Sequence, residues 1–147
     1  MNKKGITILE LIIVCVIIAI GTLLLVPSIG SWVNHYRLRT AVRDVVSIMR
    51  VAQMKAVATN MEYQVKFSYT TYMLQYRSSS GSNWVTEGSP KLLPSGVAII
   101  KFPPWSKFEF NPNYTTSTGS LTLQNAKGHT KRITLTTATG RIRVISP

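Results

Sequence analysis

A long uncharged stretch near the amino terminus constrains this chain more than any other feature. Leu11–Val33 holds 23 residues without a charge, and Leu11–Val26 is almost wholly aliphatic. As a helix, this stretch would extend about 34 Å, which is enough to cross the hydrocarbon core of a bilayer. A cleaved secretory signal would have a shorter apolar stretch followed by a small-x-small cleavage site, and neither is found here. We therefore predict a hydrophobic transmembrane helix over residues 6–33.

The helical pattern continues after this stretch, but with a polar side. Between Asn34 and Asn60, apolar residues recur at the spacing of one helix face. This stripe contains Val42, Val45, Val46, Met49, Ala52 and Ala56, whereas Arg43, Ser47, Arg50 and Met54 lie largely off it. The pattern predicts one helix of roughly 80 Å from Ile6 to about Thr59, with residues 34–60 as its amphipathic continuation. Asn60 is the expected stop. Pro27 removes a backbone donor and is expected to kink or locally open the helix.

Short alternating segments follow from Met61 and predict strands. The candidates are 63–67, 72–76, 97–102, 107–110, 121–124, 132–136 and 141–145, the last two forming a closing hairpin around Thr139-Gly140. Pro90–Gly96 is expected to break the chain. Residues 61–147 make only a small core, so the amphipathic helix must supply a second layer. The predicted fold is α+β: a long amino-terminal helix packed against a small antiparallel β-sheet domain.

The composition excludes most enzymatic sites. The chain has five acidic residues, two histidines and one cysteine. One cysteine allows no internal disulfide and no cysteine-cluster metal site, and so few carboxylates make multi-metal sites hard to build. The sequence has no G-x-S-x-G, H-E-x-x-H, P-loop or G-x-G-x-x-G motif. We expect a protein that is not an enzyme and that has no cofactor and no metal.

Glu10 is the anomaly of the apolar segment. A carboxylate within an apolar membrane helix costs a few kcal/mol unless it is paired. It could reach water at the interface of the membrane. Alternatively, cleavage after Gly5 would create an amine on Ile6, and the amine of a neighbouring copy could neutralise the Glu10 carboxylate.

The run KKGITILELIIVCVIIAIG, from Lys3 to Gly21, resembles the amino termini of type IV pilins and type II secretion pseudopilins. Those proteins carry a short basic leader that ends in Gly, then a hydrophobic helix with Glu five residues after the cut and often a proline further along. Gly5, Glu10 and Pro27 fit, whereas Ile6 departs from the common Phe. The resemblance implies that a prepilin peptidase removes the leader, residues 1–5, and methylates the amine of Ile6. It also implies that Glu10 and Pro27 act in assembly.

The rest of the chain resembles the GspH/FimT group of pilin-like proteins. The likeness lies in RVAQMKAVATN (Arg50–Asn60), GSNWVTEG (Gly81–Gly88) and GSLTLQNAKGHTKRITLTTATGRIRV (Gly119–Val144). It implies a structural subunit, a minor pilin or pseudopilin of a type II secretion pseudopilus or a type IV pilus. Its partners would be other pilin or pseudopilin subunits, the peptidase and inner-membrane lipid. The protein would cross the bacterial inner membrane once, with a cytoplasmic amino terminus and a periplasmic carboxy-terminal domain.

The net charge of +12 suggests a polyanionic partner. Five basic residues gather near the end of the chain: Lys127, Lys131, Arg132, Arg141 and Arg143. In a strand, Arg141 and Arg143 would share a face about 6.6 Å apart, which suits contacts with successive phosphates. Their GRIR motif also resembles one associated with DNA capture by FimT-type minor pilins. The alternative function is therefore DNA uptake in natural transformation, although many strands carry a solvated basic face that has no DNA role.

A second basic cluster lies on the predicted helix. Arg37 and Arg39 would lie just outside the membrane, within reach of lipid phosphate. Arg43, Arg50 and Lys55 are expected to pair with acidic residues of neighbouring subunits.

Overall fold

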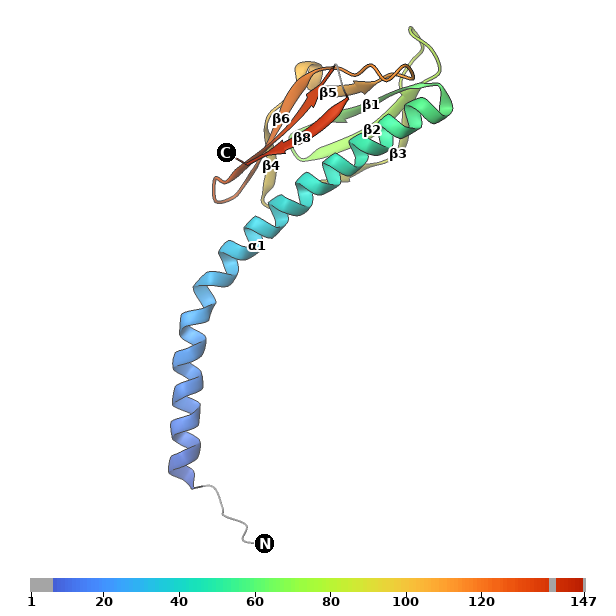
Figure 1. Cartoon of the computed structure of the whole chain (residues 1–147). Coiled ribbons are helices and arrows are strands. Elements are labelled where there is room, and N and C mark those ends of the chain that lie inside the picture. Colours follow the sequence, from blue (N-terminus) through green and yellow to red (C-terminus); the bar gives the residue numbers. More distant parts are fainter. Residues whose placement is uncertain (1–6, 138–139, 147) are drawn as a thin grey trace. The chain divides into compact units, whose positions relative to one another are not determined.

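The structure is a computed structural model that describes residues 7–137 and 140–146, without the side chains of residues 23–29. One long helix precedes all the strands (Figure 1). In chain order the elements are α1 (Ile8–Thr59), β1 (Glu62–Phe67), β2 (Thr71–Arg77), β3 (Val85–Leu92), β4 (Val97–Lys101), the 3-10 turn η1 (Pro104–Ser106), β5 (Lys107–Phe110), β6 (Gly119–Asn125), β7 (Thr130–Thr136) and β8 (Arg141–Ile145). The α+β class predicted from the sequence is confirmed.

The strands form two antiparallel sheets of four strands each. The first sheet has the order β3-β2-β1-β5, and the second has the order β4-β6-β7-β8. In the first sheet, Tyr63 lies opposite Tyr76 and Phe110, and Val65 lies opposite Leu74 and Phe108. In the second sheet, Leu121 lies opposite Ile133 and Leu123 opposite Lys131.

The chain divides into two compact units, Met1–Val33 and Asn34–Pro147. In the first unit, the large apolar side chains of α1 from Ile8 to Ile20 are exposed, at values between 80% for Ile8 and 47% for Val14. Its Thr22 hydroxyl bonds to the carbonyl oxygens of Ile18 and Ala19, at 3.0 and 2.9 Å, so this polar group is satisfied within the helix. In its described residues, the first unit is thus a helix with an apolar surface and without a packed core of its own.

A membrane span was expected over residues 6–33. Among the described residues, no helix combines the length and the apolar character needed to cross a bilayer. Ile6 and the side chains of residues 23–29 lie outside that set.

The core belongs to the second unit, where α1 lies along the sheets (Figure 1). The predicted stripe is confirmed: Val42, Val45, Met49, Ala52 and Ala56 are 0 to 4% exposed, and Val46 packs against them partly buried. Leu38 and Ala41 extend the stripe toward the amino terminus. Both sheets present their apolar faces to this core, through residues such as Phe108 and Phe110 in the first sheet and Leu121, Leu123, Ile133 and Leu135 in the second. The helix and the two sheets therefore share one core.

Most predicted strands are confirmed, but β3 was missed. Pro90 lies inside β3 rather than in a chain break. A proline lacks the N–H that a central strand needs, but β3 is an edge strand with a free side. Its pairing with β2 shifts register between Tyr72 and Leu74, and Gly88 adopts a positive φ of 74° within that irregular segment. The mostly exposed side chains of β3 gave no alternating pattern to detect.

The end of α1 follows the sequence prediction. The helix ends at Thr59, and Asn60 takes a left-handed φ of 54°, a conformation that Asn tolerates better than most residues. At Pro27 the backbone stays helical, since α1 is continuous from Ile8 to Thr59, so the local opening expected there is not found. The β7–β8 hairpin is confirmed, although Ala138 and Thr139 at its tip lie outside the described residues.

Two methionines of α1 test the shared core. Met49 is fully buried and Met54 is 64% exposed on the same helix. We predict that Met49→Ala lowers the free energy of unfolding by about 2–5 kcal/mol, because it removes buried contacts and leaves a cavity. Met54→Ala should change it by less than about 0.5 kcal/mol. Urea unfolding of the full chain in nonionic detergent, followed by circular dichroism, measures both; equal effects would contradict the packing described.

Candidate functional site

The residues expected to act in assembly lie in or before the first unit. Gly5 and Ile6 are outside the described residues. Glu10 is exposed in the first turn of α1, and its backbone N–H donates to the Thr7 hydroxyl at 3.3 Å. Thr7 thus caps the start of the helix. Pro27 lies within α1, and its side chain is not described. The assembly roles of these residues stay predictions.

The five carboxy-terminal basic residues divide between two faces of the second sheet. Arg141 and Arg143 lie opposite Thr136 and Thr134 of β7, and residues directly opposite share a face. Arg132 alternates with the buried Ile133 and so lies on that same outer face. All three arginines are exposed. The structure therefore brings Arg132, Arg141 and Arg143 together on the face turned away from the core.

The two lysines of this predicted set lie elsewhere. Lys127 is exposed in the turn between β6 and β7. Lys131 lies opposite the buried Leu123, on the sheet face that looks toward α1, and its Nζ bonds to the Ser146 hydroxyl at 3.0 Å. Lys131 thus belongs to a different surface from the three arginines.

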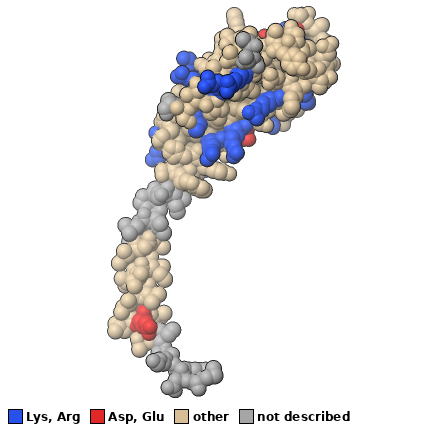
Figure 2. Space-filling model, in the orientation of Figure 1, with Lys and Arg blue, Asp and Glu red and all other residues tan. Residues whose placement is uncertain are grey.

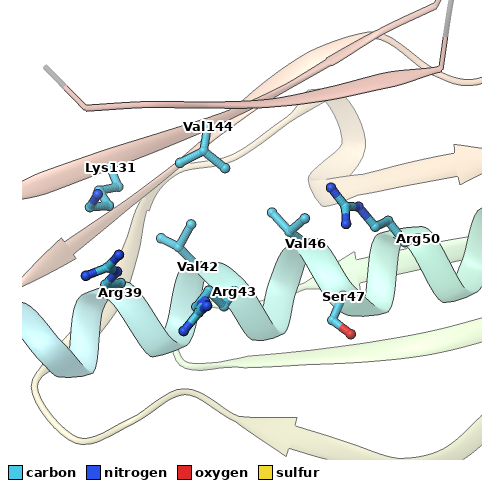
Figure 3. A pocket seen from close by; sticks show the side chains of 8 residues that line it. All are labelled: Arg39, Val42, Arg43, Val46, Ser47, Arg50, Lys131 and Val144. Carbon is cyan, nitrogen blue, oxygen red and sulfur yellow. The ribbon is translucent and has the colours of Figure 1, made fainter.

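That surface is a groove of about 420 Å³ between α1 and the β7–β8 hairpin (Figure 3). Its basic residues are Arg39, Arg43, Arg50 and Lys131. Val42, Val46 and Val144 supply the apolar lining, and Ser47 completes it. In Figure 3, Val144 points from β8 toward Val42 and Val46 of α1. No acidic side chain lines the groove.

The groove lies on a strongly basic face of the second unit. Figure 2 shows Lys and Arg side chains in two bands on this face, one along α1 and one over the strands beside it. The sequence from Asn34 to Pro147 carries 15 basic and 4 acidic residues. With so few acids, their positions decide which basic groups are neutralised.

Three of these four acids are paired within the described residues. The Arg77 Nε bonds to Glu62 at 2.5 Å, and the Lys107 Nζ lies 2.6 Å from Glu109. The Arg77 guanidinium also lies over the Trp84 ring, 4.5 Å from its centroid. These two pairs lie on the first sheet, away from the groove, so their carboxylates do not neutralise the groove.

The third pair corrects an expectation for Lys55. This lysine was expected to pair with a neighbouring subunit, but its ammonium bonds to the Glu87 carboxylate of β3 in the same chain. That hydrogen bond raises the pKa of Lys55 above its ordinary value. The pair joins the carboxy-terminal part of α1 to an edge strand of the first sheet.

Asp44, the fourth acid, lies on the other flank of α1. It lines a separate hollow of about 450 Å³ together with Tyr72 and Lys91. Burial raises the pKa of the Tyr72 phenol above its ordinary value, and the negative charge of Asp44 raises it further. The helix therefore separates the flank that carries Asp44, which faces β2 and β3, from the basic groove.

The two histidines, which the sequence did not connect, meet in the structure. The rings of His35 from α1 and His129 from the β6–β7 turn have centroids 4.2 Å apart. Within residues 7–137 and 140–146, no three His, Cys, Asp or Glu side chains gather in a way that could hold a metal ion.

Comparison with solved structures identifies known proteins with a similar fold. No protein-family model and no curated protein sequence matches the chain. Two solved structures of the minor pseudopilin EpsH from the type II secretion system of Vibrio cholerae do match, each with a TM-score of 0.62. One covers 76% of this chain and 98% of the EpsH chain at 10% identity; the other covers 78% and 96% at 9% identity. The chain has the fold of a minor pseudopilin. The fold that the GspH/FimT resemblance implied is thereby confirmed.

The groove was not predicted from the sequence. Arg39 was expected at the lipid surface, and Lys131 was expected beside Arg132, Arg141 and Arg143. The available signal was the spacing of Arg39, Arg43 and Arg50, which places all three along one side of a helix. The strand side of the groove could not be predicted from the sequence, because it depends on which face of β7 meets α1.

The pKa of the Tyr72 phenol tests the electrostatic contact between Tyr72 and Asp44. Its folded pKa lies above the unfolded value, so its contribution to stability is intact below pH 10 and is lost as the pH rises through the folded pKa. We predict that Asp44→Asn lowers the pKa of Tyr72 but leaves it above 10.0, because burial is the larger cause. Tyrosinate absorbance measured against pH, with Tyr72→Phe to assign the signal, checks this. An unchanged titration in Asp44→Asn would contradict the electrostatic contact.

Proposed function

We propose that the chain is a minor pseudopilin, a structural subunit of a type II secretion pseudopilus. The observation that carries the proposal is the fold, which covers nearly the whole of EpsH. The leader motif at Lys3–Gly5 and the exposed apolar surface of α1 support it independently, because a helix without a core of its own needs a partner to cover it.

In this proposal, assembly depends on α1. Cleavage after Gly5 frees the amine of Ile6, and the peptidase then methylates it. The apolar helices of neighbouring subunits pack together, and Glu10 pairs with the amine of a neighbour. Because an unpaired carboxylate among apolar helices is costly, this pairing sets the register of the subunits.

The same proposal includes the inner membrane. Before assembly, the apolar part of α1 would hold the subunit there, with a cytoplasmic amino terminus and the second unit in the periplasm. This orientation is supported by the leader resemblance. The distribution of basic residues does not decide it, because they flank the apolar stretch on both sides: Lys3 and Lys4 before it, Arg37 and Arg39 after it.

Two substitutions separate processing from assembly. We predict that replacing Gly5 blocks leader removal, whereas Glu10→Ala is cleaved normally but is lost from sheared filaments. Glu10→Asp keeps the carboxylate and is the control. Mass spectrometry of the amino terminus and immunoblots of the filament fraction measure the two steps. Normal incorporation of Glu10→Ala would contradict the role assigned to Glu10.

DNA uptake is the second candidate function. The observation that favours it is the exposed trio of Arg132, Arg141 and Arg143 on the outer face of the second sheet. Arginine suits phosphate contacts, and the described acids of the second unit lie in ion pairs elsewhere or beside Tyr72. A DNA-binding subunit could still assemble through α1, so the two functions are compatible.

Binding to duplex DNA tests this second function. We predict that Arg141→Ala with Arg143→Ala weakens binding and lowers the slope of log affinity against log salt by about two, one for each lost phosphate contact. Lys66→Ala with Lys91→Ala removes the same charge from the first sheet and is the matched control. No binding by the unmodified full chain at low salt would exclude the function.

A further inference from the structure

The groove beside α1 is open along an unpaired strand edge. β8 is the last strand of the second sheet, and no described strand pairs with its outer edge. The core is not fully covered at this edge. Val144 lies opposite Ile133, which is fully buried, yet Val144 itself is 45% exposed. If a further strand paired with this edge of β8, it would lie over the groove and cover Val144.

The dimensions of the groove fit an added strand. Arg39 and Arg50 are eleven residues apart on α1, which corresponds to about 16 Å along the helix axis. β8 has five residues and a similar length of about 16 Å. Figure 3 shows β8 and α1 running alongside one another at the groove. A strand that pairs with β8 would therefore pass along the whole row of helix arginines.

The charge of the groove determines what kind of strand could enter. Four cations line it and no acid does, and the described carboxylates of this unit lie in ion pairs on the first sheet, at Lys55, or on the other flank of α1. No salt bridge within the described residues involves Arg39, Arg43 or Arg50. A partner that enters must bring its own negative charge.

We propose that the groove binds an extended acidic segment of another protein, which adds a fifth strand to the second sheet. Its backbone pairs with the free edge of β8. Side chains on one face alternate with those on the other, so every second residue of the segment faces the groove. On that face, acidic residues meet the helix arginines and Lys131, and apolar residues between them cover Val42, Val46 and Val144. This surface does not depend on α1 assembly or on the outer arginine trio.

The observations favour such a peptide over two other occupants. A second copy of this chain carries only four acids between Asn34 and Pro147 against 15 basic residues, so like charges would oppose its docking. Single-stranded nucleic acid binds through aromatic stacking as well as charge, and no aromatic side chain lines the groove. The apolar lining instead suits aliphatic side chains.

The test uses the full chain in nonionic detergent and a synthetic Val-Glu peptide, long enough for one strand, in which Glu and Val take turns at every second position and Ser fills the positions between them. We expect the peptide to bind at low salt and the analogue with Lys in place of Glu not to bind. Arg43→Glu with Arg50→Glu should weaken binding at least tenfold. Arg141→Glu with Arg143→Glu makes the same charge change on the outer face and should leave binding within about twofold. Circular dichroism confirms that both variants remain folded.

Two further peptides test the pairing with β8. Each carries N-methyl groups on one of the two alternating sets of backbone amides. Because only one set faces β8, one peptide should lose binding and the other should keep it. The proposal is overturned if the Val-Glu peptide does not bind, if both charge-reversal variants weaken it equally, or if both methylated peptides bind normally. It is also overturned if single-stranded DNA displaces the peptide and itself requires Arg43 and Arg50.

Discussion

The packing of one apolar helix stripe against two sheets supports the rest of the second unit. Leu38, Val45, Met49 and Ala52 leave almost no surface exposed, and the inner faces of both sheets meet them. Each four-stranded sheet has an apolar face that needs a second layer to cover it, and the helix supplies that layer. The positions of all the surface groups follow from this packing, since it determines which face of each strand is buried.

The small number of acidic residues gives this arrangement its electrostatic character. Glu62, Glu87 and Glu109 are each held by a base nearby, and Asp44 lies beside Tyr72. The groove between α1 and β8 and the outer face of the second sheet therefore keep their positive charge. These are two separate basic surfaces on opposite faces of β8, and they suit different partners. Neither surface includes the exposed apolar part of α1 before Val33.

Local patterns were sufficient to predict most of the elements. The periodicity of Val42, Val45 and Met49 identified the buried side of α1, and Asn60 marked its end. The alternation in β1, β2 and β7 identified those strands. The sequence did not predict β3, because an edge strand needs neither alternation nor a full set of backbone donors, and Pro90–Gly96 was expected to break the chain. For the candidate site, the outer arginines were found because alternation in one strand is enough to place Arg141 and Arg143 on a single face.

The long helix with its apolar first half, the α+β class and the excess of positive charge could all be predicted from the sequence. These depend on composition and on spacing along one segment. Only the tertiary structure decided that Lys55 pairs with Glu87, that Lys131 faces α1 rather than the outer arginines, and that the groove opens beside the free edge of β8. The reason is physical: each of these depends on which strand lies at an edge and which face meets the helix, and residues far apart in the chain settle both.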